Sequence, residues 1–284
     1  MKSKARVVNW AVEAHEGEQH VVDGLLVNNA EYVGKQLKTD KSVPGRLRND
    51  EYADFYRDVL KADQETVAII RYGYNIPLDS MPPETGITPN NKSCEAAPDF
   101  VWEEMVRYTT LGCIREVDRP SRVMLPLSVV FSNKTCLVVD ASRHLNPYVT
   151  KESTRLDSLE ELEEMVRPGM YFAVDDLDSG YWHVGLNPES YELCGCSVVD
   201  PKTGRRHYFQ WIVLFLGVTS AVTVFTQVTL PIKIYLRTDC GWIGLMYIDD
   251  VLSGGYSYHE GLYWKFFTKD LMGRCGWVIN LDKG

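Results

Sequence analysis

Apolar and polar positions follow two different periods along the chain. Residues 1–45 show no sustained period and are expected to form a loosely ordered extension. From there, apolar side chains recur every three to four positions and predict a helical segment over residues 46–85. The same spacing predicts helices over residues 98–111, with Gly112 as the stop, and 262–272. In the helix over residues 98–111, the side chains expected to face inward are Phe100, Val101, Met105 and Tyr108.

Two short apolar runs that meet carboxylates predict strands. Residues 170–174 form one run, after a capping box that begins at Ser158, and this run leads directly into Asp175 and Asp176. The second run, residues 244–252, encloses two adjacent aspartates between glycines, which predicts a hairpin with its tip near residues 247–250. We expect Asp176 at the end of a central strand beside this hairpin.

The clustered carboxylates suggest a metal site. Neighbouring carboxylates repel each other, so a cation between or beside them stabilises their ionised forms. Oxygen ligands of this kind suit Mg²⁺. Two alternatives stay open from the residues alone: Asp249 and Asp250 are also ordinary turn residues, and either Asp175 or Asp176 could be the ligand from the first strand.

The order and spacing of these motifs resemble a known family. Asp176-Leu-x-x-Gly-Tyr181 and Tyr247-Ile-Asp-Asp250 resemble motifs A and C of reverse transcriptases, residues 213–226 between them resemble motif B, and residues 275–284 resemble motif D. Over residues 45–284 the chain is most similar to the reverse transcriptases of DIRS-type (tyrosine-recombinase) retrotransposons.

The resemblance implies an α+β fold, a right-hand polymerase palm backed by helices, with fingers, over residues 86–284. It implies an RNA-directed DNA polymerase that joins dNTPs to a primer 3′-hydroxyl on an RNA or DNA template. Two Mg²⁺ ions, or Mn²⁺, would be held by Asp176, Asp249 and Asp250. The thumb and RNase H are expected to be encoded elsewhere or lost.

Further roles follow from the same resemblance. Tyr181 matches the steric gate that selects deoxynucleotides, Gly217 matches a residue that lets the backbone approach the nucleotide, and Lys283 matches the lysine that protonates pyrophosphate. Cys136 stands where the family has an arginine on the triphosphate, so the cations expected to replace it are Lys134 and Arg143. Tyr247 completes the expected substrate contacts.

Composition bears on partners and location. A net charge of −9 argues against a nucleic-acid binder, although the metal site and an acidic surface helix over residues 157–164 account for part of it. Seven cysteines without a C-x-x-C pair, and no secretory signal, predict a cytoplasmic or nuclear protein that is not secreted. Residues 211–236 are the longest weakly polar stretch, but Gln227, Pro231 and Lys233 interrupt it, so no membrane span is expected.

A second function class also fits the sequence. Besides Cys136, residues Phe215 and Val222 replace the prolines usual in motif B. Together with the acidic charge and the missing thumb, these departures favour a catalytically inactive palm remnant that binds nucleic acid or protein.

Overall fold

The computed structural model describes residues 20–22, 25–27, 43–132 and 135–280. It is a mixed α+β structure, as expected, with small antiparallel sheets and packed helices. The strands are β1 (His20–Val22), β2 (Leu25–Val27), β3 (Ile114–Val117), β4 (Leu127–Val130), β5 (Cys136–Val139), β6 (Tyr171–Asp176), β7 (Gly195–Val199), β8 (Arg206–Trp211), β9 (Ile243–Tyr247) and β10 (Asp250–Gly255). The helices are α3 (Asp50–Asp58), α4 (Gln64–Tyr72), α5 (Lys92–Glu95), α6 (Pro98–Leu111), α7 (Leu159–Met165), α8 (Ala221–Tyr235) and α9 (Tyr258–Arg274).

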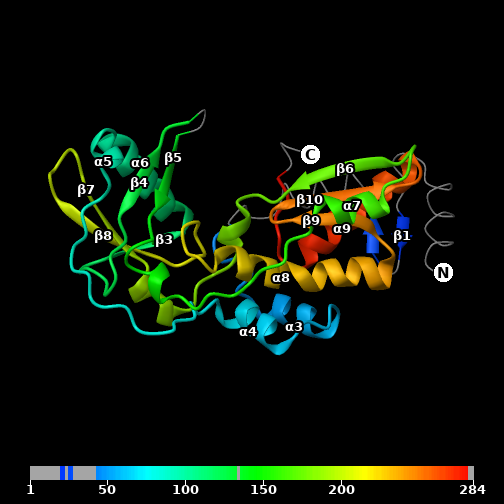
Figure 1. The fold of residues 1–284 in the computed structure, drawn as a ribbon, viewed down its shortest axis with the longest axis horizontal. Coiled ribbons are helices and arrows are strands. Elements are labelled where there is room, and N and C mark those ends of the chain that lie inside the picture. The colour runs from blue at the N-terminus through cyan, green and yellow to red at the C-terminus, as the bar shows by residue number, and fades with distance from the viewer. Residues whose placement is uncertain (1–19, 23–24, 28–42, 133–134, 281–284) are drawn as a thin grey trace.

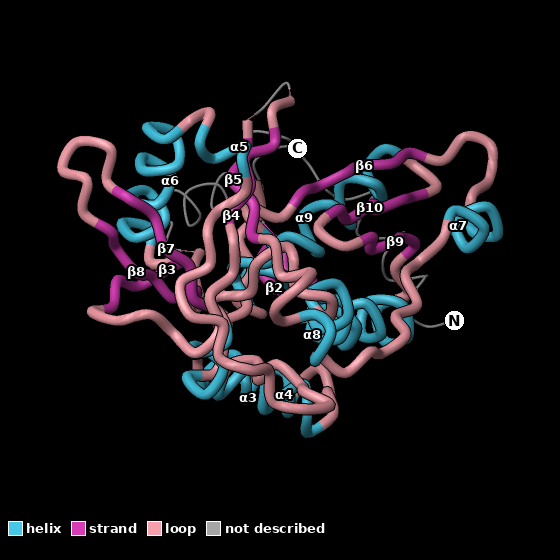
Figure 2. The backbone as a smooth tube through the Cα atoms, turned by 60° about the vertical axis from the view of Figure 1, so that its left-hand side comes forward, coloured by secondary structure: helices cyan, strands magenta, loops and turns pink. Residues whose placement is uncertain are grey.

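The sheets lie in two parts of the molecule (Figure 1). One part holds the sheet β3–β8–β7 and the hairpin β4–β5, with α5 and α6 beside them. The other part holds the sheet β6–β10–β9, which packs against α9. Helix α8 runs between this second sheet and the pair α3–α4 (Figure 2). The acidic strand ends therefore belong to the second part, and α8 underlies it.

Local signals place several helices as predicted. Helix α6 spans the predicted residues, and it ends because Gly112 adopts the left-handed conformation (φ 84°). Its inward face buries Val101, Met105 and Tyr108, while Phe100 is only partly buried. Before β6, the Ser158 side chain accepts from the Glu161 N–H and starts α7, which confirms Ser158 as the N-cap of this helix.

Helix α9 is longer than the predicted residues 262–272. It begins four residues earlier because the Ser257 hydroxyl accepts from the Glu260 N–H (3.1 Å). The Glu260 carboxylate in turn accepts from the Tyr256 N–H (2.8 Å). This Ser-x-x-Glu spacing is a start signal that the apolar pattern alone did not include.

Strand β6 lies at the edge of its described three-stranded sheet, and β10 is the central strand. The prediction that Asp176 ends a central strand is therefore wrong. Strand order depends on contacts between segments far apart in sequence, and an apolar run does not encode it. Within the described residues, no helix is both long enough and apolar enough to cross a bilayer.

Candidate active site

The predicted acidic site lies where β6 ends beside the β9–β10 turn. The strand register places Asp176 opposite Asp250, and Asp250 opposite Tyr247. Residues directly opposite in an antiparallel pair point to the same face of the sheet, with Cβ atoms about 4.5–5.5 Å apart. The structure therefore brings Asp176 and Asp250 together on one face, at one end of the sheet.

The neighbouring Asp175 belongs to the other face, because side chains alternate along a strand. It is buried, and its Oδ1 lies 2.8 Å from Lys269 Nζ and 4.0 Å from Lys265 Nζ, both on α9. Of the two candidates from this strand, Asp175 forms a buried ion pair with α9, and Asp176 is the one that faces Asp250.

The hairpin tip consists of Ile248 and Asp249, within the predicted range. Ile248 has φ 55°, a left-handed conformation that is a clear outlier for a β-branched residue. A positive φ at only the first central residue is the pattern of a type II′ turn, where glycine is usual. Backbone strain of this kind is common at functional sites and persists only where the surrounding structure enforces it.

Asp249 lies close to the segment that follows Asp176. Its carbonyl accepts from the Leu177 N–H (2.9 Å), and a Cβ added at Gly180 would lie 3.3 Å from the Cβ of Asp249. Burial raises the pKa of Tyr181, and the negative charge of Asp249 raises it further. The Tyr181 ring packs on Phe225 of α8, with centroids 4.9 Å apart. The predicted gate residue and the predicted ligand Asp249 are therefore neighbours.

A residue that sequence reasoning missed, Asn280, also reaches Asp176. The Asn280 N–H donates to the Asp176 carbonyl (2.7 Å), and its side-chain Nδ2 lies 3.3 Å from Asp176 Oδ2. The only sequence signal for it is its place in the segment that resembles motif D. Lys283, from the same segment, lies outside the described residues.

His183 connects the same two segments. Its Nε2 accepts from the Val278 N–H (3.0 Å), and its Nδ1 lies 3.1 Å from the Gly180 carbonyl. These contacts require the neutral tautomer with the proton on Nδ1. Burial lowers the pKa of His183 to about 3; the Gly180 contact opposes this shift and the charge of Arg46 adds to it.

Gly217 contacts the backbone of Val139, in β5, and the side chain of Asn146, which follows β5. It has φ 122°, and a Cβ there would lie 2.3 Å from the Val139 carbonyl oxygen. The Asn146 side chain donates to the Gly217 carbonyl (2.8 Å) and accepts from the Thr219 N–H (2.9 Å). The close approach that demands glycine here is to the backbone of Val139, and approach to a nucleotide stays a prediction.

The expected triphosphate contacts lie around β5. Cys136 is exposed at the start of β5, opposite Val130. Arg143 is exposed in the turn that follows β5, and Lys134 lies outside the described residues. The structure thus places a neutral thiol on an accessible surface where the resembled family has an arginine.

The carboxylates do not form a finished metal site. Among the described residues, no three His, Cys, Asp or Glu side chains converge into a set that could hold a metal ion. Asp176, Asp249 and Asp250 offer only oxygen donors, which suits Mg²⁺. Coordination by all three therefore requires their side chains to rotate from the arrangement seen here.

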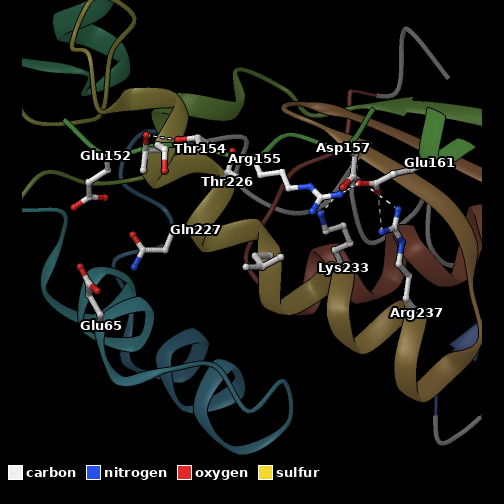
Figure 3. Close-up of a pocket in the computed structure, with 13 residues that line it drawn as sticks. Glu65, Glu152, Thr154, Arg155, Asp157, Glu161, Thr226, Gln227, Lys233 and Arg237 are labelled. Carbon is white, nitrogen blue, oxygen red and sulfur yellow. Dashed lines mark hydrogen bonds and ion pairs between the residues drawn. The ribbon is translucent and has the colours of Figure 1, made fainter. Parts of the chain in front are cut away.

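A cleft of about 540 Å³ opens elsewhere, along α8. Its lining includes Asp157, Glu161, Lys233 and Arg237 (Figure 3). It also includes Thr223 and Thr226 from the segment that resembles motif B, but none of the predicted catalytic, metal or substrate residues. Comparison with models of protein families gives no match for this chain, and comparison with curated proteins gives none either.

Proposed function

We propose that this chain is the fingers and palm of an RNA-directed DNA polymerase of a retrotransposon. The observation that carries the proposal is the register of Asp176 with Asp250, next to Asp249 in a strained two-residue turn. Like charges directly opposite each other destabilise a sheet. Their placement on one face is best explained by a cationic ligand, and the order of the motifs supports a polymerase.

In the proposed reaction, each residue of the site has a separate role that follows from its position. Asp176, Asp249 and Asp250 would hold two Mg²⁺ ions, which supply activation of the primer hydroxyl and neutralisation of phosphate charge. Asn280 orients Asp176 through backbone and side-chain contacts. Tyr181, packed on Phe225 beside Asp249, is placed to limit the space at a nucleotide sugar.

Primer extension on poly(rA)/oligo(dT) with dTTP, in Mg²⁺ or Mn²⁺, tests the proposal. We expect extension by the wild-type chain and none by Asp249→Asn, with equal circular dichroism spectra. Full activity in Asp249→Asn would exclude the proposed site. A wild-type chain that does not extend the primer, even when a thumb domain is supplied, would refute the proposed activity.

A second candidate function is a catalytically inactive palm remnant that binds nucleic acid or protein. The exposed Cys136 and the unconverged carboxylates favour it. Fluorescence anisotropy with the same template-primer distinguishes the two functions. Binding that depends on salt, without extension and without dependence on Mg²⁺, would support the remnant.

A further inference from the structure

Asp157 is a buried carboxylate that pairs with two cations at the cleft along α8. The sequence places it in an acidic surface helix, but it precedes α7 and is buried, so that expectation is wrong for this residue. Its Oδ1 lies 2.5 Å from Lys233 Nζ and its Oδ2 lies 3.1 Å from Arg237 Nη2 (Figure 3). Both cations come from the α8 region, and the carboxylate joins them to the chain before α7.

Asp157 and Arg237 also form hydrogen bonds with the outer edge of β9. In the register with β10, Gly244 and Met246 are two residues apart on β9. The Met246 N–H donates to Asp157 Oδ2 (3.1 Å), and Arg237 Nη2 donates to the Gly244 carbonyl (2.9 Å). In an antiparallel pair, the backbone N–H and C=O of every second residue point away from the partner strand, and on an edge strand these groups have no ladder partner. Asp157 therefore accepts a hydrogen bond, and Arg237 donates one, at the backbone positions where a further strand would pair with β9.

This contact lies directly before the acidic turn. Met246 is followed by Tyr247, and Met246 and Ile248 border a small gap of about 10 Å³ together with Asp157 and Lys233. Arg237 belongs to the π-helical turn Leu236–Cys240 that extends α8. Such turns often mark functional positions in helices. The strained hairpin is thus anchored to α8 through side chains, on the side where β9 has no neighbouring strand in the described sheet.

We infer that Asp157 and Arg237 are a pair of positioning residues that fix the hairpin of residues 247–250 against α8. The inference rests on the proposed function, because it assigns the pair a role in placing Asp249 and Asp250. Lys233 pairs with the Asp157 carboxylate, and its described hydrogen bond goes to this carboxylate and not to the β9 backbone.

Two variants separate positioning from general stability. Arg237→Met and Lys233→Met each remove one cation from the same carboxylate, but of the two cations Arg237 is the one with a described hydrogen bond to the β9 backbone. Amide hydrogen exchange on the full chain, resolved for residues 243–250, is the direct measurement. We expect exchange at Met246 to rise about tenfold or more in Arg237→Met, because this variant loses the hydrogen bonds from Arg237 Nη2 to the Gly244 carbonyl and to Asp157 Oδ2, the oxygen that accepts the Met246 N–H. In Lys233→Met it should change by less than about threefold, with β7–β8 unchanged in both variants.

Primer extension supplies the second readout. Arg237→Met should lower kcat by about tenfold while the KM for dTTP changes less than about threefold, because an interaction that acts only on the reacting geometry lowers kcat. Arg237→Lys, which keeps the charge, should recover part of the loss. Equal exchange at residues 243–250 in both methionine variants, or equal loosening of β7–β8, would overturn the inference. A wild-type chain without polymerase activity would refute the proposed function, and the exchange experiment would still decide whether the pair holds the hairpin.

Discussion

The imidazole Nε2 of His183 accepts a hydrogen bond from the backbone N–H of Val278, at 3.0 Å. This bond joins the turn after Asp176 to the segment that carries Asn280, and it exists only while His183 is neutral at Nε2. The stability of the acidic site is therefore coupled to the protonation of a buried residue that sequence patterns did not single out.

The first prediction concerns pH. His183 has a pKa of about 3 in the folded chain, against an ordinary value of 6.5. Between these values the unfolded state binds the proton and the folded state does not, so this contribution is complete above pH 6.5 and is lost as pH falls towards 3. We expect the unfolding free energy to fall by about 1.4 kcal/mol per pH unit below about pH 6 from this residue. Urea unfolding at pH 7.5, 6.5, 5.5 and 5.0 measures it.

The control for this prediction is His183→Gln, which cannot titrate. This variant should have a lower unfolding free energy than the wild type at pH 7.5. Its unfolding free energy should change less with pH between pH 6.5 and 5.0. Most carboxylates titrate below this window. A slope in the variant equal to that of the wild type would assign the pH dependence to other groups.

The second prediction compares neighbouring aspartates. Asp175→Asn should lower the unfolding free energy by about 3–5 kcal/mol, because it breaks the buried ion pair between Asp175 and Lys269 by removing one of the two charges. Asp176→Asn should change it by less than about 1 kcal/mol, since it also relieves repulsion with Asp250. Only Asp176→Asn should abolish extension while the chain stays folded. Comparable destabilisation by both substitutions would contradict the assignment of the two faces.

The third prediction concerns Cys136. An arginine there would add a charge-assisted contact to phosphate, which is roughly twice as strong as a neutral one. Cys136→Arg should lower the KM for dTTP by about ten- to a hundredfold. Because Cys136 is exposed, the fold should tolerate the longer side chain. If the wild type already has the lower KM, then Lys134 or Arg143 makes the contact.

The fourth prediction concerns the loop before α8. Gly217→Ala should destabilise the chain, because the new Cβ would lie 2.3 Å from the Val139 carbonyl and the residue already has φ 122°. Gly204→Ala is the matched control: it also has a positive φ (69°), but open space surrounds its Cβ. We expect about 1–2 kcal/mol for Gly204→Ala and a larger loss for Gly217→Ala, measured by thermal unfolding. Equal losses would mean that the Val139 backbone moves aside.

Local signals predicted much of the fold. The limits of α6, the cap of α7 and the turn at residues 248–249 follow from residues close together in sequence. The two opposed carboxylates could also be anticipated, since each follows an apolar run. The α+β class is confirmed, whereas the palm architecture and the activity stay predictions.

Contacts between distant segments could not be predicted. Asp157 looks like a solvated acidic residue because the two cations that bury it follow far along the chain, at Lys233 and Arg237. Gly217 looks like a flexible loop residue until Val139 is placed against it. Neither the edge position of β6 nor the contact of Asn280 with Asp176 has a local signature.

The adjacent aspartates of β6 also have a consequence for how the chain folds. A slip of one residue in the pairing of β6 with β10 would turn every β6 side chain to the opposite face. Asp176 would then enter the interior against α9, and Asp175 would leave Lys269 for the open face. A misaligned strand would thus bury a carboxylate in the wrong surroundings and separate a buried ion pair at the same time. The two adjacent aspartates therefore disfavour the shifted register and favour the observed pairing of β6 with β10 as the sheet assembles.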